Sequence, residues 1–203
     1  MKNFGYAVIS LFLIALFFAR CEDQAKNTNS DVDKDKMLAE FKKTGGYASM
    51  EKYGEHLVTI GGCNDCHSPK KMGPHGPVID TFNMLSGHPA TAPLPNVNQK
   101  EAQSKGLVVT SDLTAWVGPW GVSFTANLTP DDTGLKSWDL KQFTTAIRDG
   151  KFHGQENGRG LLPPMPWEMY RNMSDDELAA VFAYLKSLKP IENLVPAPIP
   201  PAQ

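Results

Sequence analysis

Residues 62–67 read Gly62-Cys63-Asn64-Asp65-Cys66-His67, in which two cysteines are separated by two residues and followed at once by histidine. This spacing is the pattern for covalent attachment of a c-type haem. Each thiol adds to one vinyl group of the porphyrin, and two intervening residues let both sulfurs reach one ring. The adjoining histidine is then held at the iron as an axial ligand. The stretch therefore predicts one covalent haem c, with Cys63 and Cys66 as attachment points and His67 as an iron ligand.

Two other interpretations of the cysteine pair fit less well. A thioredoxin-like redox pair needs a preceding strand in a βαβ unit, whereas the residues before Cys63 have helical periodicity. A structural zinc site needs two further ligands at metal spacing. His67 directly adjoins Cys66 and His75 comes eight residues later, so these residues do not supply that spacing.

The N-terminus predicts export. Lys2 precedes an apolar run of sixteen residues, Phe4–Ala19, which is short for a membrane-spanning helix and typical of a signal peptide. Cys21 follows before a polar run, so we expect a signal peptide at 1–20, cleavage before Cys21 and acylation of its thiol, as in bacterial lipoproteins. Arg20 departs from the small residue usual at such sites. Ordinary secretion and an uncleaved membrane anchor are the alternatives.

Composition agrees with an exported redox protein. The chain has three cysteines, and lipid at Cys21 and haem at the other two would leave no free thiol in an oxidising compartment. The formal net charge is −2 and becomes −4 without the cationic Lys2 and Arg20. The mature chain is thus mildly acidic, and no basic stripe indicates nucleic-acid binding. Sixteen prolines and seventeen glycines predict much irregular structure between few helices.

Four segments follow from these patterns: a signal peptide at 1–20, a lipid-anchored polar tether with a short helix at 21–45, a haem domain at 46–190, and a proline-rich tail at 191–203. Residues 22–36 are polar without periodicity, which is typical of a flexible tether. The short helix is expected to end at Gly45-Gly46. The tail is expected to be extended and solvated.

Three helices are expected in the haem domain. The first runs from Tyr47 to the motif; Gly54 lies on its apolar stripe and would permit close approach of another helix. Its stripe consists of Tyr47, Met50, Tyr53, Leu57, Val58 and Ile60. The second spans residues 137–149, with Ser137 as N-cap and Gly150 as stop. The third starts at Ser174, which forms a capping box with Glu177.

Strand signals occur only between residues 107 and 128. Residues 107–110 and 122–125 are rich in β-favouring side chains. The turn Gly118-Pro119-Trp120-Gly121 would close a hairpin with residues 113–117. Residues 86–106 are expected to form a long loop. Trp116 and Trp120 are expected to cover a buried edge, either of the haem or of the protein core.

Met165 is the candidate for the second iron ligand. It lies in the stretch Pro163-Pro164-Met165-Pro166-Trp167, where prolines hold the chain extended and pre-organised. A thioether on such a loop suits the sixth coordination position of haem iron. The competing methionines, which lack such flanking prolines, are Met72, Met84, Met169 and Met173. Met173 is better explained as part of a hydrophobic staple at the start of the final helix.

A backbone carbonyl is expected to accept a hydrogen bond from the free ring nitrogen of His67. Such a bond fixes the tautomer and makes the imidazole a stronger iron ligand. The proline-rich stretch after the motif offers the carbonyls of Pro74 and Pro77, and the sequence does not choose between them.

The order of helix, haem motif, long loop, helix, methionine loop and final helix resembles that of class I c-type cytochromes, from about Gly46 to Pro190. More narrowly, the chain resembles the cytochrome c modules of bacterial membrane dehydrogenase cytochrome subunits. The resemblance rests on three sequence segments, residues 57–70 (LVTIGGCNDCHSPK), 126–131 (ANLTPD) and 164–167 (PMPW). The resemblance implies a mainly α fold, with N- and C-terminal helices packed around a covalent haem, long loops and a small β-hairpin insertion.

The resemblance also implies His67 and Met165 as the axial pair, and it places Asn127, Trp138 and Arg148 near the haem propionates. Subunits of this family usually carry several haem motifs, whereas this chain has one. We therefore expect a mono-haem electron carrier rather than an enzyme.

Its expected setting is the periplasmic side of a bacterial membrane. The expected partners are redox proteins of a dehydrogenase or terminal oxidase chain, with no nucleic acid. One alternative is a haem enzyme or a gas or peroxide sensor, in which Met165 leaves the sixth position open. Another is a permanently bound subunit of a dehydrogenase or oxidase.

Overall fold

The computed structural model describes residues 32–202 and divides the chain into two compact units, Met1–Gly46 and Tyr47–Gln203. The expected signal peptide and the lipid site at Cys21 lie outside the described residues and stay predictions. No helix within the described range is both long and apolar enough to cross a membrane. The haem motif lies in the second unit.

In the first unit, residues 32–43 form a helix. Two glycines in left-handed backbone end it, Gly45 at φ 58° and Gly46 at φ 84°. The Gly46 N–H donates to the Phe41 carbonyl at 2.8 Å, which is a common way for a helix to stop. The expected helix before these glycines is therefore confirmed, but it begins earlier, so residues 32–36 are helical rather than irregular tether.

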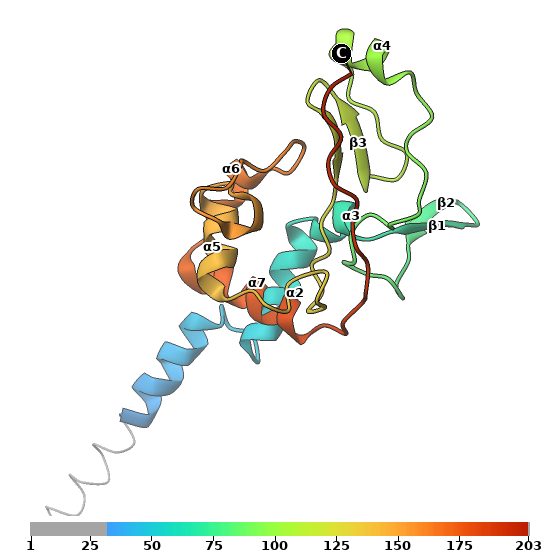
Figure 1. Cartoon of the computed structure of the whole chain (residues 1–203). Helices are drawn as coiled ribbons and strands as arrows, with labels where there is room; N and C mark the ends of the chain where they lie inside the picture. Colours follow the sequence, from blue (N-terminus) through green and yellow to red (C-terminus); the bar gives the residue numbers. More distant parts are fainter. Residues whose placement is uncertain (1–31, 203) are drawn as a thin grey trace, which may run out of the picture. The chain divides into compact units, whose positions relative to one another are not determined.

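The centre of the second unit is the packing of α2 (Met50–Ile60) against α7 (Asp175–Ser187) (Figure 1). Gly54 lies at the contact, where a Cβ would be 1.9 Å from the Ala180 carbonyl oxygen. Because only glycine leaves room for that backbone, the prediction that Gly54 admits another helix is confirmed. The buried apolar residues of this core are Leu57, Val58, Leu85, Leu135, Phe143, Leu178, Ala180, Val181 and Leu185.

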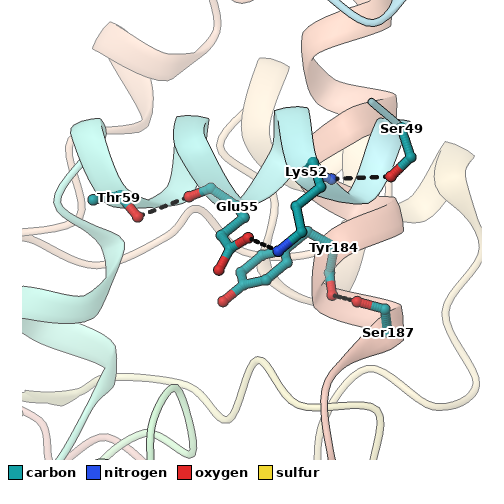
Figure 2. A network of polar contacts seen from close by, with 6 residues as sticks. All are labelled: Ser49, Lys52, Glu55, Thr59, Tyr184 and Ser187. Atoms are coloured by element: carbon teal, nitrogen blue, oxygen red, sulfur yellow. Dashed lines mark hydrogen bonds and ion pairs between the residues drawn. The ribbon is translucent and has the colours of Figure 1, made fainter. Parts of the chain in front are cut away.

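Polar groups lie beside the crossing (Figure 2). Lys52 of α2 pairs with Glu55 at 2.7 Å, and the ring of Tyr184 from α7 lies next to this pair. Burial, with a smaller contribution from Glu55, raises the pKa of Tyr184. Both side chains of the Lys52–Glu55 ion pair are exposed to solvent. Exposed pairs contribute little stability, so the crossing depends on its apolar core.

Helix boundaries differ slightly from expectation. α2 begins after Ser49, whose hydroxyl accepts from the Lys52 N–H at 3.3 Å, not at Tyr47. Ile60 is 67% exposed and is therefore not on the buried stripe.

α5 (Leu140–Arg148) is capped by Asp139 instead of Ser137. The Asp139 carboxylate accepts from the Gln142 N–H at 2.7 Å, and the Gln142 side chain accepts from the Asp139 N–H, which completes a capping box. Gly150, at φ 62°, follows α5 as expected.

The capping box of α7 is confirmed. Ser174 accepts from the Glu177 N–H at 3.2 Å, and Glu177 accepts from the Ser174 N–H at 2.7 Å. Met173, the residue before the cap, packs against the apolar core.

The expected hairpin is present as β3 (Ala115–Gly118) and β4 (Gly121–Phe124), paired antiparallel. Residues 107–110 contribute only one isolated bridge, from Val109 to Val117. The wider strand predicted there is therefore wrong.

Two elements were not expected from the sequence. An antiparallel pair, β1 (Lys70–Gly73) and β2 (Gly76–Ile79), follows the haem motif directly. A short helix, α4 (Gln99–Ser104), interrupts the predicted loop at 86–106. The second unit is thus helix-rich with two small strand pairs.

The tail at 191–203 is extended but not solvated along its length, which corrects the expectation. Ile199 exchanges two backbone hydrogen bonds with Val122, at 2.8 and 3.0 Å. The Asn193 amide donates to the Ser86 carbonyl at 2.7 Å. The tail occupies the outer edge of β4, whose N–H groups need a partner.

Candidate functional site

The haem motif forms a single helical turn, α3 (Cys63–His67). Gly62 joins it to α2 with φ 67° and ψ 19°, a left-handed conformation that glycine adopts without strain. Residues three apart lie on the same side of a helix, so Cys63 and Cys66 face one side together. This arrangement suits attachment to a single porphyrin.

Both motif cysteines are half-buried free thiols. Cys63 packs against the apolar core between α2 and α7. Burial is the main reason that the pKa of Cys63 rises to about 11, and burial also raises the pKa of Cys66. Both thiols are therefore protonated at neutral pH before any bond to haem is made.

The His67 ring is fixed by the backbone of a distant residue. Its Nδ1 lies 2.8 Å from the Ala126 carbonyl oxygen, so Nδ1 carries the proton and donates. Nε2 keeps its lone pair, and burial lowers the pKa of His67, which favours the neutral ring. A neutral imidazole with a free Nε2 is the form that binds iron.

The carbonyl groups predicted to accept this bond were the wrong ones. Pro77 belongs to β2 and Pro74 to the turn between β1 and β2, and the contact to His67 comes from neither residue. Ala126 comes just after β4 instead. The kind of interaction was predicted correctly, but its source lies 59 residues away.

Side-chain hydrogen bonds stabilise the C-terminal end of α3. The Lys70 ammonium donates to the carbonyl oxygens of Asp65 and Ser68. Ser68 is fully buried; its hydroxyl donates to the Asn64 side chain at 3.2 Å and accepts from the Leu85 N–H at 2.9 Å. These bonds fix the backbone before and after His67.

Met165 is half-buried on a loop that is attached at both ends. Before it, the Leu161 N–H donates to the Gly150 carbonyl at 2.6 Å. After it, the Trp167 ring lies so close to Gly150 that a Cβ there would be 2.4 Å from the indole. The Arg171 guanidinium also lies over this indole, 5.5 Å from the ring centroid. The expected rigid frame around Met165 therefore has contacts beyond its prolines.

A hydrogen bond joins the residues that flank the methionine loop and the haem motif. Tyr170, at the end of α6 (Trp167–Tyr170), donates from its hydroxyl to the Gly61 carbonyl at 2.5 Å. Gly61 lies two residues before Cys63, and α6 begins two residues after Met165. The structure thus brings the residue before the haem motif into contact with the helix after Met165.

The competing methionines are placed less suitably. Met72 and Met169 are 80% and 71% exposed. Met84 and Met173 pack against the apolar core and are accounted for there. Met165 remains the best placed thioether among the described residues.

The tryptophans of the hairpin have packing partners in the protein. Trp116 donates to the Leu113 carbonyl at 2.9 Å, and Trp120 donates to the Ser123 hydroxyl at 3.1 Å. Both indole N–H groups thus have partners in the protein, and the buried edge that these rings were expected to cover stays a prediction.

Two of the three residues implied at the propionates are engaged elsewhere. Both amide hydrogens of the buried Asn127 are used, one by the Thr133 hydroxyl and one by the Ile191 carbonyl. Arg148 pairs with Asp175 at 2.5 Å. Trp138 packs against the apolar core. Asn127 and Arg148 thus have partners within the protein, and their implied roles at the propionates stay predictions.

Taken together, these residues fit a covalent haem c. The chain supplies two thiols on one helix face, an imidazole with a free Nε2, and a thioether on a braced loop. Sequence reasoning missed the hydrogen bonds of Ala126, Ser123 and Tyr170, each of which joins distant segments through a backbone carbonyl that no sequence pattern marks. The Ser123 hydroxyl and the Tyr170 ring gave no local signal of their distant partners.

Known proteins give an independent comparison. The profile of the cytochrome c family matches residues 51–189. The chain is 36% identical to a nicotinate dehydrogenase subunit of Pseudomonas putida over 80 residues, which is 39% of this chain and 6% of that protein. It is 28% identical to the gluconate 2-dehydrogenase cytochrome c subunit of Pantoea cypripedii over 137 residues, 67% of this chain and 22% of that protein.

A third relative is the fructose dehydrogenase cytochrome subunit of Gluconobacter japonicus, 32% identical over 87 residues, 42% of this chain and 16% of that protein. The chain therefore spans less than a quarter of the length of each of these relatives. The resemblance to cytochrome c modules of bacterial dehydrogenase subunits is confirmed. Because the family profile covers most of the haem unit, including the motif and Met165, the chain belongs to the cytochrome c family.

Proposed function

We propose that this chain is a mono-haem electron carrier. Cys63 and Cys66 bind one haem c through thioether bonds, and His67 and Met165 are its axial ligands. The observation that carries the proposal is the 2.8 Å contact from His67 Nδ1 to the Ala126 carbonyl, which leaves Nε2 for iron. The bound haem supplies reversible one-electron chemistry at its iron.

The ligand pair favours electron transfer over catalysis. With His67 on one side and Met165 on the other, no substrate reaches the metal unless a ligand leaves. A thioether also stabilises ferrous iron and raises the reduction potential. The bonds that brace the methionine loop, from Leu161 to Gly150 and from Tyr170 to Gly61, support a permanent ligand.

The proposed setting is the periplasmic side of a bacterial membrane. A signal peptide at 1–20 directs export, and a lipid on Cys21 holds the mature protein at the membrane surface. The cytochrome subunits of gluconate 2-dehydrogenase and fructose dehydrogenase are similar over part of this chain. Their names support redox proteins as partners, and we propose partners from a dehydrogenase or terminal oxidase chain.

The test is the fate of the haem on denaturation. Treated with acidified acetone, the mature protein is expected to keep its haem on the polypeptide, with one iron per chain. Cys63→Ser, which leaves a single thioether, should yield much less haem-stained protein, whereas Cys21→Ser should stain as wild type. Haem that partitions into the solvent from the wild-type protein would refute covalent attachment.

A further inference from the structure

Ser123 is a buried residue of β4 that contacts the methionine loop. It is 6% exposed. Its hydroxyl donates to the Pro163 carbonyl at 2.6 Å and accepts from the Trp120 indole N–H at 3.1 Å. Pro163 lies two residues before Met165. The hydroxyl therefore links the β3–β4 hairpin to the loop that carries the thioether.

This bond matters because the loop has few donors of its own. Proline has no backbone N–H, so Met165 supplies the only one between residues 163 and 166. The loop backbone is consequently held mainly through its carbonyl groups. Pro163 is the carbonyl nearest before Met165 for which the structure gives a side-chain donor.

The same stretch of backbone also reaches the other axial ligand. Ala126, three residues after Ser123, accepts from His67 Nδ1 at 2.8 Å. Thr125 between them is fixed, since its N–H donates to the Thr114 carbonyl at 3.0 Å. One stretch, residues 123–126, thus contacts the His67 ring and the Met165 loop.

The hairpin that carries this stretch is itself braced. β4 pairs with β3 on one side and with Ile199 of the C-terminal tail on the other, and Figure 1 shows the tail running along the hairpin. Trp120 lies over Gly118, where a Cβ would be 2.5 Å from the indole ring. The donor to Ser123 is therefore fixed in position.

From this geometry we propose that Ser123 is a positioning residue that keeps Met165 on the haem iron. The proposal rests on the proposed His67 and Met165 ligation. The Ser123 hydroxyl restrains the backbone next to Met165, whose thioether is a weak ligand. The thioether therefore stays close to iron when the bond between sulfur and iron opens. Without the hydroxyl the loop moves more freely, and competing ligands replace Met165 more easily.

The test compares Ser123→Ala with Ser86→Ala, both as covalent holoproteins. Ser86 is a matched control because it is 2% exposed and its hydroxyl donates to the Asn83 carbonyl at 2.8 Å, away from the methionine loop. The first readout is imidazole binding to ferric protein. The second is the far-red methionine-to-iron charge-transfer band, followed as pH rises. Guanidinium unfolding measures stability separately.

Ser123→Ala is expected to bind imidazole about three- to tenfold more tightly than wild type, the factor that corresponds to one hydrogen bond. Its far-red band should be lost at lower pH. Ser86→Ala should match wild type in both readouts. A merely structural role for Ser123 would lower the unfolding midpoint and leave imidazole affinity unchanged, and that result overturns the proposal.

Trp120→Phe is the second variant. It keeps an aromatic ring over Gly118 and removes the N–H that donates to Ser123, so imidazole affinity should rise by a smaller factor. If Ser123→Ala does not fold, Trp120→Phe tests the role of Ser123 alone. An imidazole affinity of Trp120→Phe equal to that of wild type then overturns the proposal. A wild-type protein without the far-red band contradicts Met165 ligation itself and removes both proposals. A band in wild type with wild-type behaviour in Ser123→Ala removes only the role of Ser123.

Discussion

The His67 imidazole donates to a carbonyl that lies 59 residues later in the chain, at Ala126. Under the proposed ligation, this bond decides which ring nitrogen is left for iron and how the ring is turned. Met165 has no comparable bond to its sulfur among those described; its position follows from the backbone on either side. The histidine is thus oriented directly, whereas the methionine is placed by its loop.

Replacing Met165 by histidine tests the thioether at this scale. Met165→His should still give a closed, low-spin haem, because imidazole fills the same position. Its reduction potential should fall by an amount on the order of 100 mV or more, since imidazole stabilises ferric iron better than thioether does. A redox titration measures the change.

Met169→His is the matched control for that titration. Met169 lies four residues later and is 71% exposed, so its replacement should leave the potential near that of wild type. If Met165→His and Met169→His have the same potential as wild type, another residue is the axial ligand.

At the scale of elements, the haem unit depends on the contact between α2 and α7. α2 delivers Cys63 through Gly61 and Gly62, so movement of this helix moves the attachment site. Gly54 sets how closely the two helices approach, because the Ala180 carbonyl occupies the space that a Cβ would need. Close packing of this kind tolerates little added volume.

Gly54→Ala should therefore destabilise the protein by about 3 kcal/mol, near the upper end of overpacking costs. Helix propensity alone would predict the opposite sign, because alanine is favoured over glycine by about 1 kcal/mol within a helix. Guanidinium unfolding followed by circular dichroism distinguishes these outcomes. Thr59→Ala, at an exposed position of α2, is the control and should change stability by about 0.5 kcal/mol or less. A Gly54→Ala protein as stable as wild type would show that the helices do not meet at this residue.

Removal of the tail from Leu194 onward tests its docking on β4. The Val122 N–H donates to the Ile199 carbonyl at 2.8 Å, so its amide hydrogen should exchange faster in the shortened protein. The Val117 N–H donates to the Val109 carbonyl at 2.9 Å and should serve as an internal control with little change. Equal exchange at Val122 with and without the tail would restore the expectation of a solvated tail.

The sequence predicted those parts of the fold that depend on near neighbours. The haem motif, the Ser174 capping box and the Gly118–Gly121 turn are local patterns, and each is present. The Ala126 carbonyl, the docking of Ile199 and the link from Ser123 were missed. These contacts join residues far apart in the chain and mostly use backbone groups, which every residue carries. Even the cap of α5 was misassigned by two residues because both Ser137 and Asp139 are good caps.

For the whole molecule, one chain combines a covalent haem unit with a predicted site of attachment to the membrane. The lipid site at Cys21 is separated from the first described residue by ten positions. Each buried methylene of an acyl chain contributes about 0.8 kcal/mol, so two or three chains would hold the protein firmly. The predicted membrane attachment and the haem attachment involve different cysteines, so the two predictions can be tested separately.

Cys21→Ser should release the haem-bearing protein from the membrane fraction or prevent its processing at that site. Wild type should instead show an acylated Cys21 as its first residue, with residues 1–20 removed, by mass spectrometry. Cys63→Ser is the complementary control, because it should lower haem content and leave the polypeptide in the membrane fraction. A mature wild-type protein that begins elsewhere or carries an unmodified Cys21 contradicts the lipid anchor.

Carbon monoxide binding to ferrous protein tests the central claim most directly, because it asks whether the sixth position of the iron is closed by Met165. Wild type and Met169→Ala should not bind carbon monoxide at concentrations that saturate Met165→Ala. Met165→Ala should keep its haem through the thioethers and His67, and should bind the gas readily. If wild type binds carbon monoxide as readily as Met165→Ala does, Met165 is not the ligand, and a haem enzyme or sensor with an open site replaces the electron carrier.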